Sequence, residues 1–304
     1  MDRTAEKYAI IFAYFLIYVV WGSTYYFIGV ALEGFPTFVL GAARFGVAGA
    51  ILLLACLMRG EKVFGRRLIL SSAVSGTVLL FVDMAVIMLA QRYVSSSLVA
   101  IVASSTAIWI MLLDVPMWRR NFSRASTVAG LLAGFAGVAL LYLEQFFSEN
   151  HVLHHSEYGI LILLAGCVSW AVGSLYAKYR SGKAERRDDF AGSAWQMLAA
   201  ALMFVLASWA TGDFASMRME SIPVRAWAAL AYLIVFGSLM AYPAYVWLLK
   251  RRPAAEVGTH AYVNPVVAVI IGGLCGEDIT LFQLCGLAVI LLSVMSITKH
   301  NNNK

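Results

Sequence analysis

The chain has 304 residues, of which 61% are apolar and only 13% charged, and its mean hydropathy is +0.78. Soluble domains carry about 25% charged residues, so this composition excludes an ordinary soluble protein and indicates a membrane protein. The net charge of +6 does not indicate nucleic-acid binding, because the basic residues lie in short connections between apolar runs.

Apolar runs long enough to cross a bilayer follow one another along the whole chain. A spanning helix needs about 20 predominantly apolar residues. The predicted spans cover residues 8–30, 36–58, 68–90, 97–117, 126–143, 158–177, 191–210, 224–248, 254–275 and 281–298. Most connections between them are short. The sequence therefore predicts an all-α integral membrane protein with ten transmembrane helices in the lipid bilayer.

The basic residues are distributed unevenly between the two sides of the predicted membrane protein. All but four of the 23 lysines and arginines lie near the chain ends or in the connections on the same side as the ends. The exceptions are Arg92, Arg218 and Arg225 on the opposite side and Arg44 within the second span. Because basic residues concentrate on the cytoplasmic side, we expect a multi-pass protein with both termini in the cytoplasm.

The two halves of the chain resemble each other weakly at an offset of about 150–160 residues. Trp21, followed by Gly22-Ser23 in the first span, aligns with Trp170, followed by Gly173-Ser174 in the sixth. Each half has an odd number of spans, so the halves would insert in opposite orientations. We therefore expect two inverted five-helix repeats, residues 1–145 and 156–299, around a central cavity near the midplane.

Three motifs in the first half carry a family resemblance: Trp21-Gly22-Ser23, Glu33-Gly34-Phe35-Pro36 and Ala42-Ala43-Arg44-Phe45. They closely resemble the opening of EamA-type members of the drug/metabolite transporter superfamily. The placement of Trp21, Trp109 and Trp170 is most similar to the aromatic amino-acid exporters of the YddG type. The resemblance implies a secondary carrier of the bacterial inner membrane that exports amino acids, aromatic or other bulky apolar ones among them, and related metabolites by alternating access, and it implies no cofactor.

Two charged residues lie inside predicted spans, where a charge costs several kcal/mol unless it faces protein or water. Arg44 lies in the second span; it either contacts an anion or ties helix ends together, and the family pattern favours a structural role. Asp83 lies midway along the third span. Its carboxylate is a candidate to bind a substrate ammonium, to relay protons or to pair with Arg44.

The ninth span carries a polar stripe. Glu256 and His260 are four residues apart and share a helix face, and Asn264 and Pro265 follow them. We expect His260 and Asn264 to face a cavity, with an interior, hydrogen-bonded histidine as the alternative. Glu256, Pro243 and Pro265 are candidates for a structural or gating role, since a proline in a span frees a backbone carbonyl.

Trp21, Trp109 and Trp170 lie well inside their spans, unlike the tryptophans at span ends that suit a membrane interface. They either stack on a bulky apolar solute or pack the bundle. Neutral hydrogen bonds to a zwitterion are expected from a set of hydroxyl side chains: Ser23, Ser104, Ser174 and Tyr245.

Other functions are weighed against the residues and motifs of the sequence. A multidrug or toxic-cation exporter, or another small-metabolite carrier, is the alternative, because an aromatic cavity with an acid also suits organic cations. The chain contains no GxSxG or HExxH motif, which argues against an enzyme. Histidines 151, 154 and 155 have no cysteine partner nearby, so no metal site is predicted. The sequence leaves the oligomeric state open.

Overall fold

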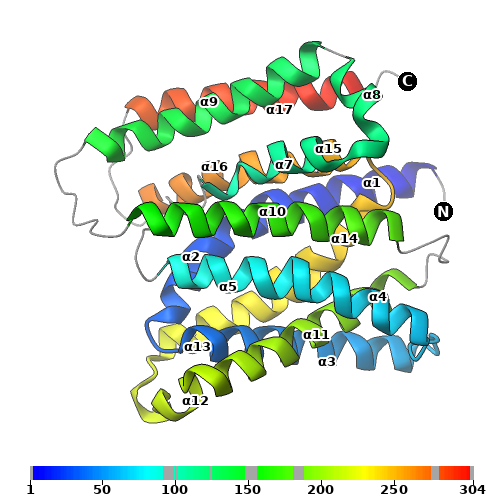
Figure 1. Cartoon of the computed structure of the whole chain (residues 1–304), viewed down its shortest axis with the longest axis vertical. Helices are drawn as coiled ribbons and strands as arrows, with labels where there is room; N and C mark the ends of the chain where they lie inside the picture. The colour runs from blue at the N-terminus through cyan, green and yellow to red at the C-terminus, as the bar shows by residue number, and fades with distance from the viewer. Residues whose placement is uncertain are drawn as a thin grey trace.

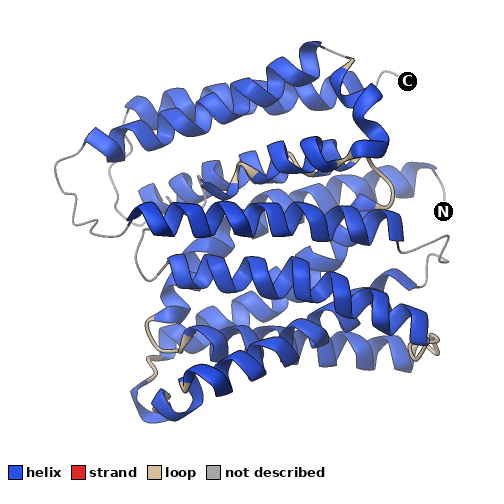
Figure 2. Cartoon of the chain, viewed as in Figure 1, coloured by secondary structure: helices blue, strands red, loops and turns tan. Residues whose placement is uncertain are grey.

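The computed structural model describes residues 3–91, 99, 102–123, 125–147, 156–180, 188–274 and 281–301. Every secondary-structure element within these ranges is a helix, and the long helices lie side by side in a bundle (Figure 2). The described part of the chain therefore confirms the predicted all-α class.

The elements of the first half are α1 (Arg3–Phe15), η1 (Leu16–Val20), α2 (Trp21–Leu32), α3 (Thr37–Met58), α4 (Arg66–Gly76), η2 (Thr77–Val82), α5 (Asp83–Ala90), α7 (Thr106–Leu113), η3 (Val115–Met117), α8 (Trp118–Phe122) and α9 (Ala125–Phe147). Those of the second half are α10 (Ser156–Arg180), α11 (Asp188–Thr211), α12 (Asp213–Ser216), η4 (Met219–Ser221), α13 (Val224–Tyr232), η5 (Leu233–Ala241), α14 (Tyr242–Leu249), α15 (Ala254–Val257), α16 (His260–Leu274) and α17 (Leu281–Asn301).

Among the described residues, six helical segments are long and apolar enough to cross a membrane. They are Thr4–Leu32, Thr37–Met58, Arg66–Ala90, Leu161–Tyr179, Asp189–Thr211 and Val224–Leu249. The other predicted spans fall on α7, on α9, on α15 with α16, and on α17. Parts of α9 and α17 form shorter apolar helices. These helices are consistent with a multi-pass membrane protein, and the count of ten spans stays a prediction.

Long helices from the two halves pack in pairs. α3 lies against α11, and α9 lies against α17 (Figure 1). The ring of Phe45 on α3 stacks on Phe204 of α11, with centroids 5.8 Å apart. A Cβ atom on Gly134 of α9 would lie 2.7 Å from the Ser293 hydroxyl oxygen of α17. Small residues of this kind let helices approach closely where lipid offers no hydrophobic drive for their association.

The ninth predicted span is broken. α15 ends at Val257 and α16 begins at His260, with Gly258 and Thr259 in a turn between them. Two local effects account for this difference from the predicted unbroken helix. Glycine is a weak helix former, and the Thr259 hydroxyl donates to the Glu256 carbonyl at 2.6 Å, a local bond that competes with regular helix geometry.

Different segments of the chain lie at the two ends of the helix bundle. α1 begins and α17 ends at the same end of the bundle, where the α3–α4 turn with Arg59 and Lys62 also lies (Figure 1). The short helix α12 lies at the opposite end (Figure 1). This arrangement gives the basic turn and the two chain ends a common side.

Candidate solute-binding site

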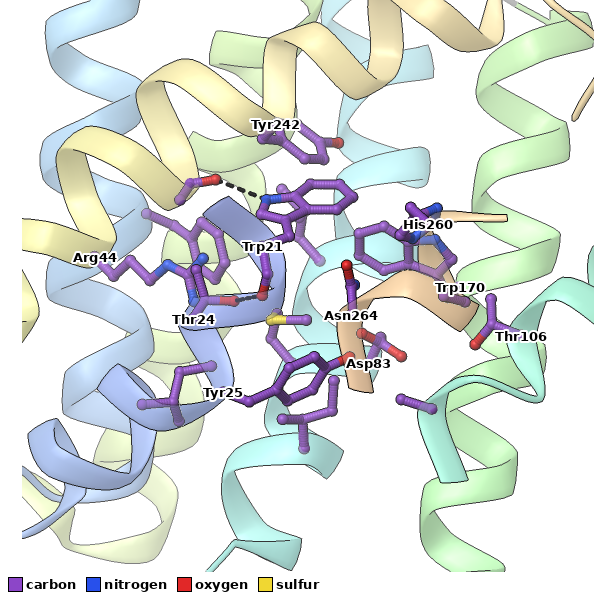
Figure 3. A pocket seen from close by; sticks show the side chains of 18 residues that line it. Trp21, Thr24, Tyr25, Arg44, Asp83, Thr106, Trp170, Tyr242, His260 and Asn264 are labelled. Atoms are coloured by element: carbon purple, nitrogen blue, oxygen red, sulfur yellow. Dashed lines mark hydrogen bonds between the residues drawn. The ribbon is translucent and has the colours of Figure 1, made fainter. Parts of the chain in front are cut away.

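A cavity lies inside the bundle, among helices from both halves of the chain. It holds about 650 Å³ of space between its lining atoms, part of it open to solvent. Its lining combines aromatic and aliphatic side chains with a few polar and charged groups, as is usual for small-molecule sites. Figure 3 shows that its polar and aromatic side chains come from segments far apart in the sequence. The cavity is therefore the leading candidate for a binding site.

Two helical stripes make up much of the lining. Both have the spacing i, i+3, i+4, i+7, which places their members on one helix face. On α2 the stripe is Trp21, Thr24, Tyr25 and Ile28; on η2 and α5 it is Leu80, Asp83, Met84 and Ile87. Of these eight residues, only Trp21 and Asp83 are predicted site residues from the sequence. The other lining residues of the two stripes could have been predicted from helix periodicity, because they share a helix face with Trp21 or Asp83.

A π-helical segment ends directly before a lining residue in three places: η1 before Trp21, η2 before Asp83 and η5 before Tyr242. Such wide turns are rare and occur frequently at functional sites, because they re-aim side chains and leave carbonyls without helical partners. Pro243, in the first turn of α14, lacks the N–H that would continue the ladder into η5.

Four rings form an aromatic cluster, and three of them, Trp21, Trp170 and His260, line the cavity. Trp21 lies edge-on to Trp170 with centroids 5.4 Å apart, and both rings contact Tyr245 at 5.0 and 5.3 Å. His260 lies 5.3 Å from Trp21. The Trp21 indole donates to the Gly237 carbonyl at 3.0 Å, a bond drawn in Figure 3, and the Trp170 indole donates to the Tyr245 hydroxyl at 3.0 Å. The aligned tryptophans of the two halves thus meet in space.

Arg44 and Asp83 both line the cavity. The two residues are only 4% and 5% exposed, so the guanidinium and the carboxyl group are both removed from bulk water. The Arg44 Nε donates to the Ser238 hydroxyl at 2.9 Å, and the guanidinium carbon lies 4.9 Å from the centre of the Phe45 ring. No ion pair joins Arg44 and Asp83 among the described residues. The pairing considered from the sequence is therefore not formed.

Asn264 fastens α16 to η1. When its amide is oriented to satisfy the hydrogen bonds around it, the nitrogen donates to the carbonyls of His260, Ile17 and Tyr18 at 3.0, 3.1 and 3.2 Å. The His260 Nδ1 lies 2.8 Å from the Val257 carbonyl, so the tautomer with Nδ1–H donating leaves Nε2 as an acceptor. Both residues line the cavity, as the polar stripe predicted.

A polar network of hydrogen bonds joins α1 and η1 to the segment of α15 and the turn that follows it. The Glu256 Oε1 accepts from the Tyr14 hydroxyl at 2.8 Å and from the Arg252 Nε at 3.0 Å. The Tyr18 and Thr259 hydroxyls lie 2.7 Å apart. Glu256 therefore joins α1 to α15, away from the cavity lining.

The structure brings five of the predicted solute-contacting residues to the cavity lining: Trp21, Asp83, Trp170, His260 and Asn264. The other five lie outside it. Ser23 contacts the Tyr232 hydroxyl at 2.6 Å, the hydroxyls of Ser174 and Tyr245 lie 2.7 Å apart, and Ser104 is fully buried. Trp109 packs against the main apolar core. Histidines 151, 154 and 155 lie outside the described residues.

The bundle and its partly polar cavity define a helical membrane protein with a candidate solute site lined by both halves of the chain. The chain belongs to the EamA-like transporter family, which matches residues 8–143 and again 157–299. Membership confirms the family indicated by the Trp21-Gly22-Ser23 and Arg44 motifs. The resemblance to aromatic amino-acid exporters stays a prediction.

Two relatives and one solved structure show how far the similarity extends. The chain is 31% identical over 296 residues to the "Uncharacterized inner membrane transporter YedA" of Escherichia coli (strain K12), covering 94% of this chain and 89% of that protein. It is 25% identical over 282 residues to the "Probable amino-acid metabolite efflux pump" of Salmonella typhimurium, covering 91% and 90%. A crystal structure at 20% identity covers 97% and 99%, with a TM-score of 0.74, and shares the fold.

Proposed function

We propose that this transporter exports neutral amino acids, including bulky apolar ones, and related metabolites across the bacterial inner membrane. The observation that carries the proposal is the cavity, which combines the Trp21 and Trp170 rings with one buried carboxylate and one buried guanidinium. Aromatic walls suit an apolar substituent, and a few convergent polar groups fix orientation. The relative named as an amino-acid metabolite efflux pump supports the same solute class.

We also propose that the chain consists of two inverted five-helix repeats, residues 1–145 and 156–299. The double match to the family supports the duplication. Helix contacts support it too. α2 packs against α13 and α16, while α10, its counterpart in the second half, packs against α5 and α7. These are the contacts expected when the two halves exchange places, because the first span corresponds to the sixth, the third to the eighth and the fourth to the ninth.

Alternating access follows from this inverted-repeat architecture if one half of the bundle rocks against the other around the cavity. We propose that the network of Tyr14, Glu256 and Arg252 closes one end of the path, since its hydrogen bonds join α1 to α15. Opening that end requires α1 and α15 to separate. Pro243, Pro265 and the broken turn at Gly258 supply points where the spans bend with few helical hydrogen bonds to break.

The end of the bundle that carries both termini faces the cytoplasm in this proposal. Two exposed positions at opposite ends test it: Lys62 in the α3–α4 turn and Ser216 at the end of α12. In a chain whose native cysteines are replaced, we expect Ser216→Cys to react with a membrane-impermeant maleimide on intact cells. Lys62→Cys is expected to react only after the cells are opened. The reverse pattern would overturn the orientation.

Purified protein in liposomes tests the solute class. We expect saturable flux of labelled neutral amino acids above that of protein-free vesicles. The rival is a toxic-cation exporter, favoured by the buried Asp83 carboxylate in an aromatic cavity. Flux of cationic dyes without any amino-acid flux would establish that rival and reject amino-acid export.

A further inference from the structure

Arg44 and Asp83, whose ionised forms carry opposite charges, line the cavity, and neither has a counter-charge among the residues that the structure describes. Among the described residues, the only protein hydrogen bond of the Arg44 guanidinium is the one from Nε to Ser238, and no carboxylate lies within ion-pair distance. A guanidinium has five N–H donors, so its terminal nitrogens remain for a ligand. A Cβ atom on Gly237 would lie 3.0 Å from Nη2, so the absent side chain leaves that nitrogen room.

Asp83, like Arg44, is buried and forms no ion pair within the described part of the chain. It is 5% exposed, and within the described chain no lysine or arginine lies close enough to form an ion pair with it. Figure 3 shows its carboxylate beside Tyr25 and Asn264, with Arg44 beside Thr24 and Trp21 on another side of the cavity. Arg44 on α3 and Asp83 on α5 thus line the same cavity, and they form no ion pair with each other.

Buried charges without partners are costly inside a membrane, and residues of this kind usually serve a substrate or an ion path. A solute with only a positive charge would neutralise Asp83 and leave Arg44 uncompensated beside it. A solute with only a negative charge would do the reverse. One solute class compensates both groups at once, namely a molecule that carries an ammonium and a carboxylate.

We infer that Arg44 and Asp83 form a zwitterion clamp, in which Arg44 binds the carboxylate and Asp83 the ammonium of a neutral amino acid. The inference rests on the proposed function and assigns Arg44 a substrate contact in place of the structural role expected from the sequence. The apolar substituent then lies against the Trp21–Trp170 wall. The clamp also rejects solutes with a single charge, since each exposes an uncompensated group.

Three probes of matched shape test the clamp: phenylalanine, phenethylamine, which lacks the carboxylate, and 3-phenylpropionate, which lacks the ammonium. The readout is the ligand-induced rise in melting midpoint of purified protein, which reports binding without requiring flux. The wild type is expected to bind phenylalanine about tenfold or more tightly than either analogue, as expected for loss of one charge-assisted contact.

Substitutions at Arg44 and Asp83 test the proposed carboxylate and ammonium contacts separately. Arg44→Gln is expected to bind phenethylamine as tightly as phenylalanine, and Asp83→Asn to bind 3-phenylpropionate as tightly as phenylalanine. Arg44→Lys keeps the charge and is expected to keep the preference for phenylalanine over the amine. Arg225→Gln is the matched control, because Arg225 pairs with Glu33 at the exposed end of α2; it is expected to behave as wild type.

Equal binding of all three probes by the wild type, or an unchanged preference in Arg44→Gln, would overturn the clamp. If Arg44→Gln does not fold, the wild-type probe series and Asp83→Asn decide. The proposed function fails separately, since it requires amino-acid flux in liposomes. Flux with no discrimination among the probes would reject only the clamp.

Discussion

Replacing Gly76 by alanine is expected to remove most of the folded transporter. A Cβ atom at this position would lie 2.2 Å from the carbonyl oxygen of Gln196 and 2.7 Å from its Cα. These are backbone atoms of α11, so no side chain can rotate away and the helices must separate. We expect a cost of about 3 kcal/mol or more, at the upper end of overpacking effects, measured as the melting midpoint and monodisperse yield in detergent.

Gly46→Ala is the matched control. Gly46 also faces α11, but its added Cβ would meet Ala201 at 3.7 Å, an ordinary contact distance. Since alanine is the better helix former by about 1 kcal/mol, this variant is expected to be neutral or slightly more stable. Equal yields and melting midpoints for the two variants would contradict the close approach of α4 to α11.

Truncation of the aromatic wall is expected to give the largest loss of transport. Trp21→Ala removes the indole bond to the Gly237 carbonyl and the ring contacts to Trp170 and Tyr245. We expect Trp21→Ala and Trp170→Ala each to reduce flux of a bulky solute about tenfold or more per folded molecule. The measurement is the initial rate in liposomes, normalised to folded protein.

Trp209→Ala makes the same substitution on α11 at a ring that is 81% exposed, and it is expected to leave the rate unchanged. Trp21→Phe and Trp170→Phe keep a ring in place if the alanine variants fold poorly. Unchanged rates in all four wall variants would remove these tryptophans from the site.

The fold was largely predictable because the bilayer imposes simple rules on sequence. Apolar length locates helices such as α3 and α11 to within a few residues, since a spanning helix must match the hydrocarbon thickness. The α15–α16 break was not predicted, because Gly258 and Thr259 remain apolar or neutral enough to pass for a continuous span. The π-helical segments η1, η2 and η5 were not predicted either, because a π-helical turn changes the backbone geometry and leaves the apolar composition of the span unchanged.

The site was predictable only where a residue type is rare inside a membrane. Trp21, Asp83 and His260 stood out in this way, and the structure brings all three to one cavity. Thr24 and Tyr25 were missed because they look ordinary in a mixed span. Ser104 and Ser174 were included because hydroxyls are versatile, but helix rotation turns them away from the cavity lining. That rotation depends on packing between distant segments, which a single sequence does not encode in any local pattern.

We propose that this chain carries a neutral amino acid through a site that opens to one side at a time. Counterflow tests it most directly. Liposomes preloaded with unlabelled phenylalanine are placed in a trace of labelled phenylalanine. A carrier is expected to accumulate label transiently above its equilibrium level in preloaded vesicles and not in unloaded ones. Label that never exceeds equilibrium, for phenylalanine and for the other neutral amino acids, would contradict the account.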